Sequence, residues 1–209
     1  MRARMARAPQ IPLDLAPAPD FTFETFIEAP SNAEALSMLR AWPGWPAPAM
    51  LLIGPEATGK THLGEAWLAR SHSVFLDDAH TRTDDALFGF INRALRGEIP
   101  GLLLASRVAP DQWGVQLPDL RSRLSAMPKV VLHEPNDESL RPIARALFER
   151  RGRVVPEDVV DYLMRHAPRD VPELRRTIAE IDDAARAGKA DVTKAFVARV
   201  LRENLDLFD

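Results

Sequence analysis

The sequence of 209 residues contains no cysteine and only one tyrosine. The lack of cysteine excludes disulfide scaffolds, thiolate zinc sites and cysteine nucleophiles. The sequence also lacks any run of about 18 apolar residues, so it predicts no membrane-spanning helix. Because 46% of the residues are hydrophobic, the chain can build a sizeable core without a structural metal. A net charge of −3 argues against wholesale binding to a nucleic-acid backbone.

Proline is abundant and unevenly placed, since eight of the 18 prolines precede Ala49. The prolines among residues 1–20 forbid a helix there, and this segment is predicted to form an extended tail. The first residues are basic but lead into proline rather than into an apolar signal core, so we expect a cytoplasmic protein.

Short apolar segments alternate with helical patterns as far as Pro135. This alternation predicts an α/β domain over residues 21–135, with a parallel sheet covered on both faces. Four helical patterns follow and predict a separate α-helical domain over residues 136–209. The predicted strands are residues 50–53, 73–76, 101–105 and 129–133, and the predicted C-terminal helices are residues 137–151, 156–166, 171–186 and 194–204.

A phosphate loop follows the first predicted strand and opens a helix. Its glycines allow backbone N–H groups to turn toward phosphates, and the helix N-terminus adds its positive end. Lys60 is placed to reach the β- and γ-phosphates, and the Thr61 hydroxyl to ligate Mg²⁺. The predicted ligand is ADP or ATP with Mg²⁺. The candidate binding residues are Gly54, Pro55, Glu56, Ala57, Thr58, Gly59, Lys60, Thr61 and His62.

Two carboxylates, Asp77 and Asp78, end the second predicted strand. Asp77 is the candidate Mg²⁺ ligand, and Asp78 can polarise an attacking water. Only 16 residues lie between Lys60 and Asp77, barely enough for one helix and one strand. One interpretation is that an edge strand is missing and the sheet has about four strands. The alternative is a substitute strand whose carboxylates bind no metal.

Together with these motifs, the segment from Phe26 to about Arg202 resembles the DnaA family of AAA+ ATPases. Within that family it most resembles the short DnaA-related regulators of the Hda group in their alphaproteobacterial form. Residues 26–32 resemble the segment that packs near the adenine. Residues 102–107 resemble the sensor-one strand, which implies that Ser106 contacts the γ-phosphate or the attacking water. Residues 120–124 resemble the box with the arginine finger, which implies that Arg123 acts on a neighbour's γ-phosphate, with Arg121 in support.

The resemblance also exposes a departure from the family pattern. A sensor-two arginine is expected where Pro172 stands, in the context Val171-Pro172-Glu173-Leu174. Because Asp170 and Glu173 form a capping pair and proline is tolerated in a first turn, the helix itself is expected. Arg175 or Arg176 could substitute on the same face. Weak or absent hydrolysis, or a preference for ADP, would follow.

The tail resembles the sliding-clamp-binding peptide of the same family in residues Gln10, Ile11, Leu13 and Leu15. In an extended backbone its apolar side chains point one way, as insertion into pockets requires. Residues 205–208 offer a second, weaker clamp-type segment, or simply a last apolar turn. The sequence contains no basic recognition helix, so we expect no direct sequence-specific DNA binding.

These observations favour a regulator of replication initiation that binds the sliding clamp (the polymerase III β subunit) and stimulates ATP hydrolysis by DnaA. One alternative is a self-assembling AAA+ ATPase resembling a helicase loader, which would form homo-oligomers. Another is a scaffold that binds clamp and initiator but no nucleotide.

Overall fold

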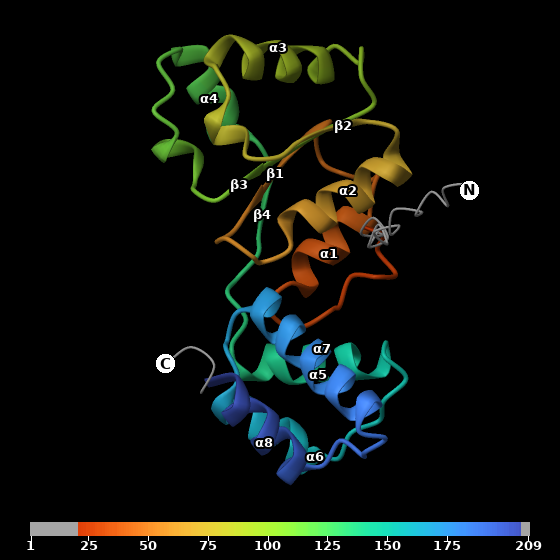
Figure 1. Cartoon of the computed structure of the whole chain (residues 1–209). Coiled ribbons are helices and arrows are strands. Elements are labelled where there is room, and N and C mark those ends of the chain that lie inside the picture. The colour runs from red at the N-terminus through yellow and green to blue at the C-terminus, as the bar shows by residue number, and fades with distance from the viewer. Residues whose placement is uncertain (1–20, 206–209) are drawn as a thin grey trace, which may run out of the picture.

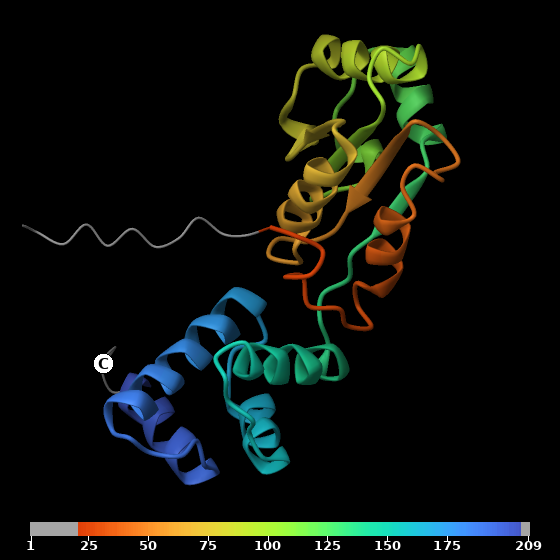
Figure 2. The ribbon, with the colours of Figure 1, turned by 90° about the vertical axis from the view of Figure 1, so that its right-hand side faces the viewer.

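The computed structural model describes residues 21–205, and these form two lobes joined by the chain between β4 and α5 (Figure 1, Figure 2). The predicted 1–20 tail and most of the 205–208 segment lie outside the described residues. None of the described helices is long and apolar enough to cross a membrane. The N-terminal lobe holds a sheet with helices on both faces, and the C-terminal lobe is entirely helical.

A four-stranded parallel sheet organises the N-terminal lobe in the order β2-β3-β1-β4. The prediction of a short sheet of about four strands is confirmed. Strand β2 lies at one edge of this sheet. The strands are β1 (Ala49–Ile53), β2 (Val74–Leu76), β3 (Leu102–Ser106) and β4 (Lys129–Val131).

Helices cover both faces of this sheet because successive strand residues point to opposite sides. On β1, Met50 and Leu52 pack with α1 and α2, whereas Leu51 and Ile53 pack with α3 and α4. The same alternation sends Leu103 of β3 toward α2. The elements of the lobe are α1 (Ala33–Arg40), α2 (Lys60–Ser71), η1 (Ala79–Thr81), α3 (Asp84–Leu95), η2 (Pro110–Gln112) and α4 (Pro118–Ala126).

The C-terminal lobe, which we call the lid, is a four-helix bundle with its own buried cluster. Apolar residues at helical spacing, such as Leu140, Ile143 and Leu147 of one helix, form its core. The lid helices are α5 (Asp137–Glu149), α6 (Glu157–His166), α7 (Val171–Ala187) and α8 (Lys194–Leu205).

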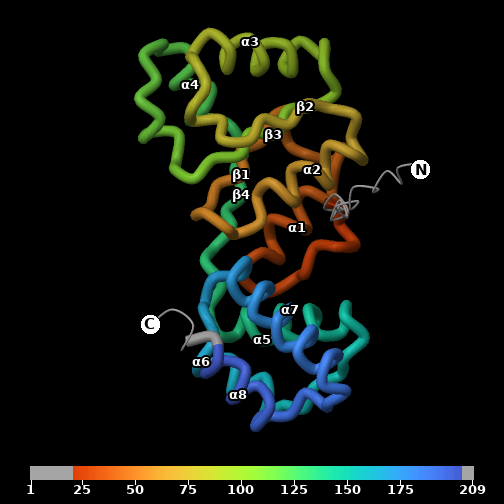
Figure 3. Tube along the Cα trace, in the orientation of Figure 1, coloured from red at the N-terminus to blue at the C-terminus, as the bar shows by residue number. Residues whose placement is uncertain are grey.

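The segment before α1 touches both lobes and lies between them (Figure 3). Ala29 is buried in the lid cluster, and the Ser31 N–H donates to Oγ of Ser139 in α5 at 3.1 Å. The carbonyl of Ser31 accepts from the N–H of His133 in the connection after β4. Asn32 is the N-cap, and its side chain binds the backbone of Ala29 and Ile27.

Candidate functional site

The phosphate loop connects β1 to α2, and close packing fixes its shape. Gly59 has φ +97°, a conformation that favours glycine. A side chain at this position would also meet the Phe26 ring, because a Cβ there would lie 2.8 Å from Phe26 Cε2. Ala57 has φ +62° and is strained in the same loop. The Lys60 ammonium turns back to donate to the Pro55 carbonyl at 2.5 Å.

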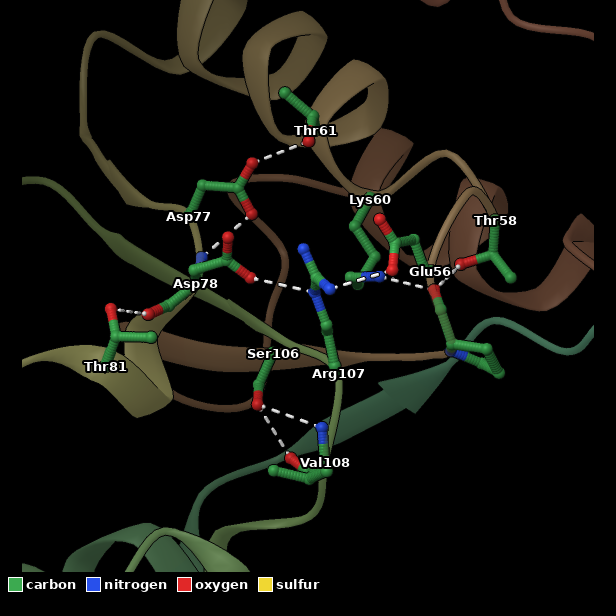
Figure 4. Close-up of polar contacts among 11 residues, drawn as sticks. Glu56, Thr58, Lys60, Thr61, Asp77, Asp78, Thr81, Ser106, Arg107 and Val108 are labelled. Carbon is green, nitrogen blue, oxygen red and sulfur yellow. Dashed lines mark hydrogen bonds and ion pairs between the residues drawn. The ribbon is translucent and has the colours of Figure 1, made fainter. Parts of the chain in front are cut away.

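Thr61 and Asp77 meet although 15 residues separate them in the chain (Figure 4). The Thr61 hydroxyl donates to Asp77 Oδ2 at 2.6 Å. Strand alternation explains this contact, because the side chains of Asp77 and Phe75 point to the same face of the sheet. Phe75 packs on the face that α2 covers. A hydroxyl and a carboxylate side by side are hard oxygen donors of the kind that Mg²⁺ prefers. These two residues therefore fit a Mg²⁺ that is otherwise coordinated by water and phosphate oxygens.

Asp78 turns away from this pair. Its backbone is left-handed, with φ +46°, and its N–H donates to Asp77 Oδ1. The Asp78 carboxylate instead faces Arg107, with Oδ1 3.5 Å from Nε (Figure 4). Nη1 of Arg107 lies 2.8 Å from Oε2 of Glu56 in the phosphate loop. One guanidinium thus links the phosphate loop to the end of β2.

Ser106, the residue proposed from the sequence as the sensor, is fully buried. Its hydroxyl donates to the Val108 carbonyl at 2.8 Å and accepts from the Val108 N–H, so it is engaged at the opposite side of the strand end from Lys60 (Figure 4). Arg107, the residue that follows β3, instead points toward Lys60 and toward the carboxylates of Glu56 and Asp78 (Figure 4). The sequence interpretation passed over it, although strand alternation already puts Arg107 on the face of Leu103 and Ala105.

Burial and the neighbouring carboxylates have opposite effects on the pKa of Lys60. Burial lowers the pKa of its ammonium below the usual value, and the Arg107 charge lowers it further. Asp77, Asp78 and Glu56 act in the opposite direction but do not outweigh burial. Two cations, Lys60 and Arg107, therefore stand beside three carboxylates at this end of the sheet.

A cavity of about 390 Å³ lies between the phosphate loop, the segment before α1 and the lid. His62 forms one wall, and its Nε2 lies 2.9 Å from the Thr22 carbonyl and 3.2 Å from Thr25 Oγ1. The rings of Phe21 and Phe26 flank it, each with its centroid 5.1 Å away. Aromatic and amide groups beside a phosphate loop are suited to a base and its sugar. The sequence did not single out Phe21, Thr25 or Ile143, which also line this cavity.

The lid closes the cavity with the first turns of α7. The predicted capping pair is present, because the Glu173 N–H donates to Asp170 Oδ1 at 2.9 Å and Pro172 is accommodated in the first turn. Pro172 and Arg175 both line the cavity. Arg176 instead pairs with Glu173 and Glu180 along the helix. Of the two arginines proposed as substitutes, Arg175 is the one that faces the candidate nucleotide site.

The candidate finger helix α4 lies at the end of the core that is opposite the lid (Figure 1). The Arg123 guanidinium stacks on the Phe88 ring of α3, with Cζ 5.0 Å from the ring centroid. Arg121 is held by a hydrogen bond of 2.7 Å to the Val115 carbonyl. The structure therefore separates Arg123 from the cavity of its own chain.

A parallel sheet with a phosphate loop after β1, a carboxylate-ended strand β2 separated from β1 by β3, and a helical lid over the cavity have the arrangement of an AAA+ core with its lid. Comparisons with known proteins agree. Residues 139–201 match the family described as Hda, lid domain. Domain III of the Thermotoga maritima replication initiation protein DnaA matches with a TM-score of 0.70 and 19% identity, over 89% of this chain and 97% of that one.

Two further solved structures share the fold. AMPPCP-bound DnaA from Aquifex aeolicus has a TM-score of 0.73 and 18% identity, over 90% of this chain and 71% of that one. The Thermotoga maritima RuvB Holliday junction branch migration motor has a TM-score of 0.59 and 15% identity, over 80% of this chain and 66% of that one. The chain thus shares the fold of these DnaA structures, and its lid, residues 139–201, matches the Hda lid-domain family.

Proposed function

We propose that this protein restrains replication initiation by stimulating ATP hydrolysis in DnaA. In this account a nucleotide in the core–lid cavity orders the two lobes, and Arg123 enters the ATP site of DnaA. A guanidinium there stabilises the charge that develops on the transferred phosphoryl group. The observation that carries the proposal is the position of α4, at the far end of the core from the cavity and the lid (Figure 1).

The surroundings of Arg123 support a role toward a partner. Its guanidinium lies over the Phe88 ring, with Cζ 5.0 Å from the centroid. A cation–π contact at a partly exposed site is worth about 0.5–1 kcal/mol, so a stronger anionic partner can recruit the guanidinium. The Hda-type lid and the DnaA-like fold support DnaA as that partner.

The proposal also includes the tail. Gln10, Ile11, Leu13 and Leu15 would dock on the sliding clamp in the cytoplasm and bring the protein to DnaA near replicating DNA. A pull-down with DNA-loaded clamp is expected to lose binding for the double variant Leu13→Ala/Leu15→Ala. Retained binding would contradict the tail assignment and leave the other parts of the proposal intact.

The finger is tested by adding the protein to ATP-bound DnaA in the presence of clamp and DNA. Arg123→Ala is expected to keep clamp binding and to lose stimulation of DnaA hydrolysis. Arg93→Ala is the matched control, because Arg93 lies on neighbouring α3 and stacks on Phe90 in the same way, 5.7 Å from its centroid. Equal stimulation by wild type and Arg123→Ala would overturn the proposal.

Nucleotide binding separates this proposal from a nucleotide-free scaffold. We expect fluorescent ADP to bind the wild type, and Lys60→Ala to abolish that binding, since Lys60 is the loop's only ammonium. A wild type that binds neither ADP nor ATP would favour the scaffold. Turnover of ATP by nucleotide-dependent homo-oligomers without DnaA would favour the self-assembling ATPase.

A further inference from the structure

Little in the sequence of α4 anchors the start of this helix. Its N-cap is Leu117, whose side chain offers no acceptor for the unpaired N–H groups of a first turn. The stretch 116–119 is exposed and lies between the buried side chains of Val115 and Leu120. The acceptors that hold the beginning of α4 therefore have to come from another part of the chain.

Asp84, the first residue of α3, provides such an acceptor. Its Oδ2 accepts from the N–H of Gln116 at 2.7 Å and from the N–H of Leu117 at 3.0 Å. Hydrogen bonds from backbone N–H groups to a carboxylate are stronger than those between neutral groups, and a negative charge is favourable at a helix N-terminus. A neighbouring helix thus supplies the cap that α4 lacks.

The same face of α3 also holds the guanidinium of Arg123. Phe88 lies four residues after Asp84, and residues at this spacing share one face of a helix. The Arg123 Cζ is 5.0 Å from the centroid of the Phe88 ring. Leu120 and Leu124 are buried in the cluster that α4 shares with α3. Helix α3 therefore fixes both the start of α4 and the side chain near its end.

The two contacts differ in what becomes of them when Arg123 acts on a partner. The guanidinium then leaves the Phe88 ring, whereas the hydrogen bonds to Asp84 come from the backbone and continue to hold the start of α4. The direction of a helix of nine residues depends on how its first turn is held. This direction matters for the finger, because a misplacement of about 1 Å can cost a catalytic group about 10²-fold in rate.

We infer that Asp84 is a positioning residue of the finger. Its carboxylate holds the start of α4, so that Arg123 reaches the ATP site of the partner in the productive orientation. The inference rests on the proposed function and adds to it a residue that acts through another. Asp85 provides the matched control, because it is an exposed acidic residue in the same first turn of α3, while the bonds to α4 come from Asp84.

The first test is amide hydrogen exchange of the whole protein without DnaA, followed in peptides that cover residues 114–126. Asp84→Ala is expected to speed exchange at the start of α4 at least about tenfold, because two N–H groups lose their acceptor. Asp84→Asn keeps an oxygen acceptor and should stay within about threefold of the wild type, and Asp85→Ala should match the wild type. Unchanged exchange in Asp84→Ala would overturn the inference. Faster exchange in α5 as well would mean general unfolding and would equally overturn a local role.

The second test follows hydrolysis of ATP bound to DnaA in a single turnover, with DNA-loaded clamp and increasing amounts of each variant. Asp84→Ala is expected to lower the maximal rate at least about tenfold and to change the half-saturating concentration less than about twofold, because a finger contributes in the transition state rather than in docking. Asp84→Asn should recover most of this rate. A smaller fraction of folded protein would instead raise the half-saturating concentration and leave the maximal rate unchanged, and that result would contradict positioning.

Arg123→Ala, measured in the same series, separates the two levels of the account. If Arg123→Ala loses stimulation while Asp84→Ala reaches the maximal rate of the wild type, Asp84 does not position the finger and the proposed function stands. If Arg123→Ala stimulates like the wild type, the finger itself is refuted, and the role of Asp84 is refuted with it.

Discussion

The Thr61 hydroxyl donates to Asp77 Oδ2 at 2.6 Å and joins the first turn of α2 to the end of edge strand β2. The strand that carries Asp77 pairs directly with β3, so the carboxylate reaches the phosphate loop although no further strand covers β2 among the described residues. The contact supports Asp77 over a carboxylate that binds no metal, and its role as a Mg²⁺ ligand stays a prediction.

Asp77→Asn is expected to abolish most of the Mg²⁺ dependence of ADP binding. The amide keeps the size of the side chain and can still accept from Thr61, but it lacks the charge that Mg²⁺ requires. Titration of ADP with Mg²⁺ and with excess chelator measures the effect, which we expect to shrink at least about tenfold. Asp85→Asn is the control, because Asp85 is an exposed residue of α3. An unchanged Mg²⁺ effect would remove Asp77 as a metal ligand.

Arg175 and Arg176 form a natural pair for testing the lid. Arg175 lines the cavity, while Arg176 pairs with Glu173 and Glu180. Arg175→Ala is expected to weaken nucleotide binding several-fold, by about 1 kcal/mol, because it removes one charged contact to a phosphate. Arg176→Ala should bind nucleotide like the wild type. Equal losses in both variants would mean that the helix, rather than the Arg175 side chain, carries the effect.

Gly64 lets α2 approach β2, and we expect its substitution to be costly. A Cβ at Gly64 would lie 2.0 Å from the Phe75 ring, whereas one at Gly89 of α3 would meet nothing within 4 Å. Gly64→Ala should lower the free energy of unfolding by about 1–3 kcal/mol through overpacking. Gly89→Ala should raise it by up to about 1 kcal/mol through helix propensity. Urea unfolding of both variants checks this, and a neutral Gly64→Ala would show that β2 can move freely.

Asp182 is fully buried in the lid among three arginines. Burial alone would raise the pKa of this carboxyl. The hydrogen bond from Arg153 and the charges of Arg186 and Arg151 more than offset burial and hold the pKa below the ordinary value of 3.8. The native protein therefore binds this proton less readily than the unfolded chain does.

The stability that Asp182 contributes is consequently present above pH 3.8 and lost as the pH falls through the lower pKa of the folded state. At pH 7, Asp182→Asn is expected to lower the free energy of unfolding by about 3 kcal/mol, since it removes the buried negative charge with which three arginines pair. Exposed Asp183→Asn is the control. The difference in the free energy of unfolding between wild type and Asp182→Asn, measured by urea unfolding, should decrease below about pH 4. A difference that does not change with pH would show that the loss comes from packing rather than from the charge.

Much of this molecule could be predicted from the sequence because its signals are local. Glycine spacing, apolar runs and the Asp170–Glu173 pair each determine structure within a few residues, and the strands and lid helices follow them to within a few residues. Contacts between distant segments could not be predicted in this way. The Asn32 side chain caps no helix, because it satisfies the backbone of the segment between the lobes.

The position of Arg107 likewise depends on contacts between distant segments, which local sequence signals do not reveal. A serine at a strand end fits a general pattern for a polar sensor, and that pattern drew attention to Ser106. Strand alternation puts Arg107 on the same face of β3 as Leu103 and Ala105, but which face of β3 turns toward the phosphate loop depends on its register against β1, where Ser106 pairs with Ile53. That register is a property of the assembled sheet.

The central claim is that Arg123 acts in the ATP site of DnaA. A single-turnover measurement of ATP already bound to DnaA tests it most directly, with DNA-loaded clamp and with wild type, Arg123→Ala or Arg93→Ala added in excess. The account predicts that wild type and Arg93→Ala accelerate the loss of bound ATP by the same large factor, of about 10³ or more if the finger is fully engaged, and that Arg123→Ala does not accelerate it. Acceleration by Arg123→Ala equal to that by the wild type would contradict the account.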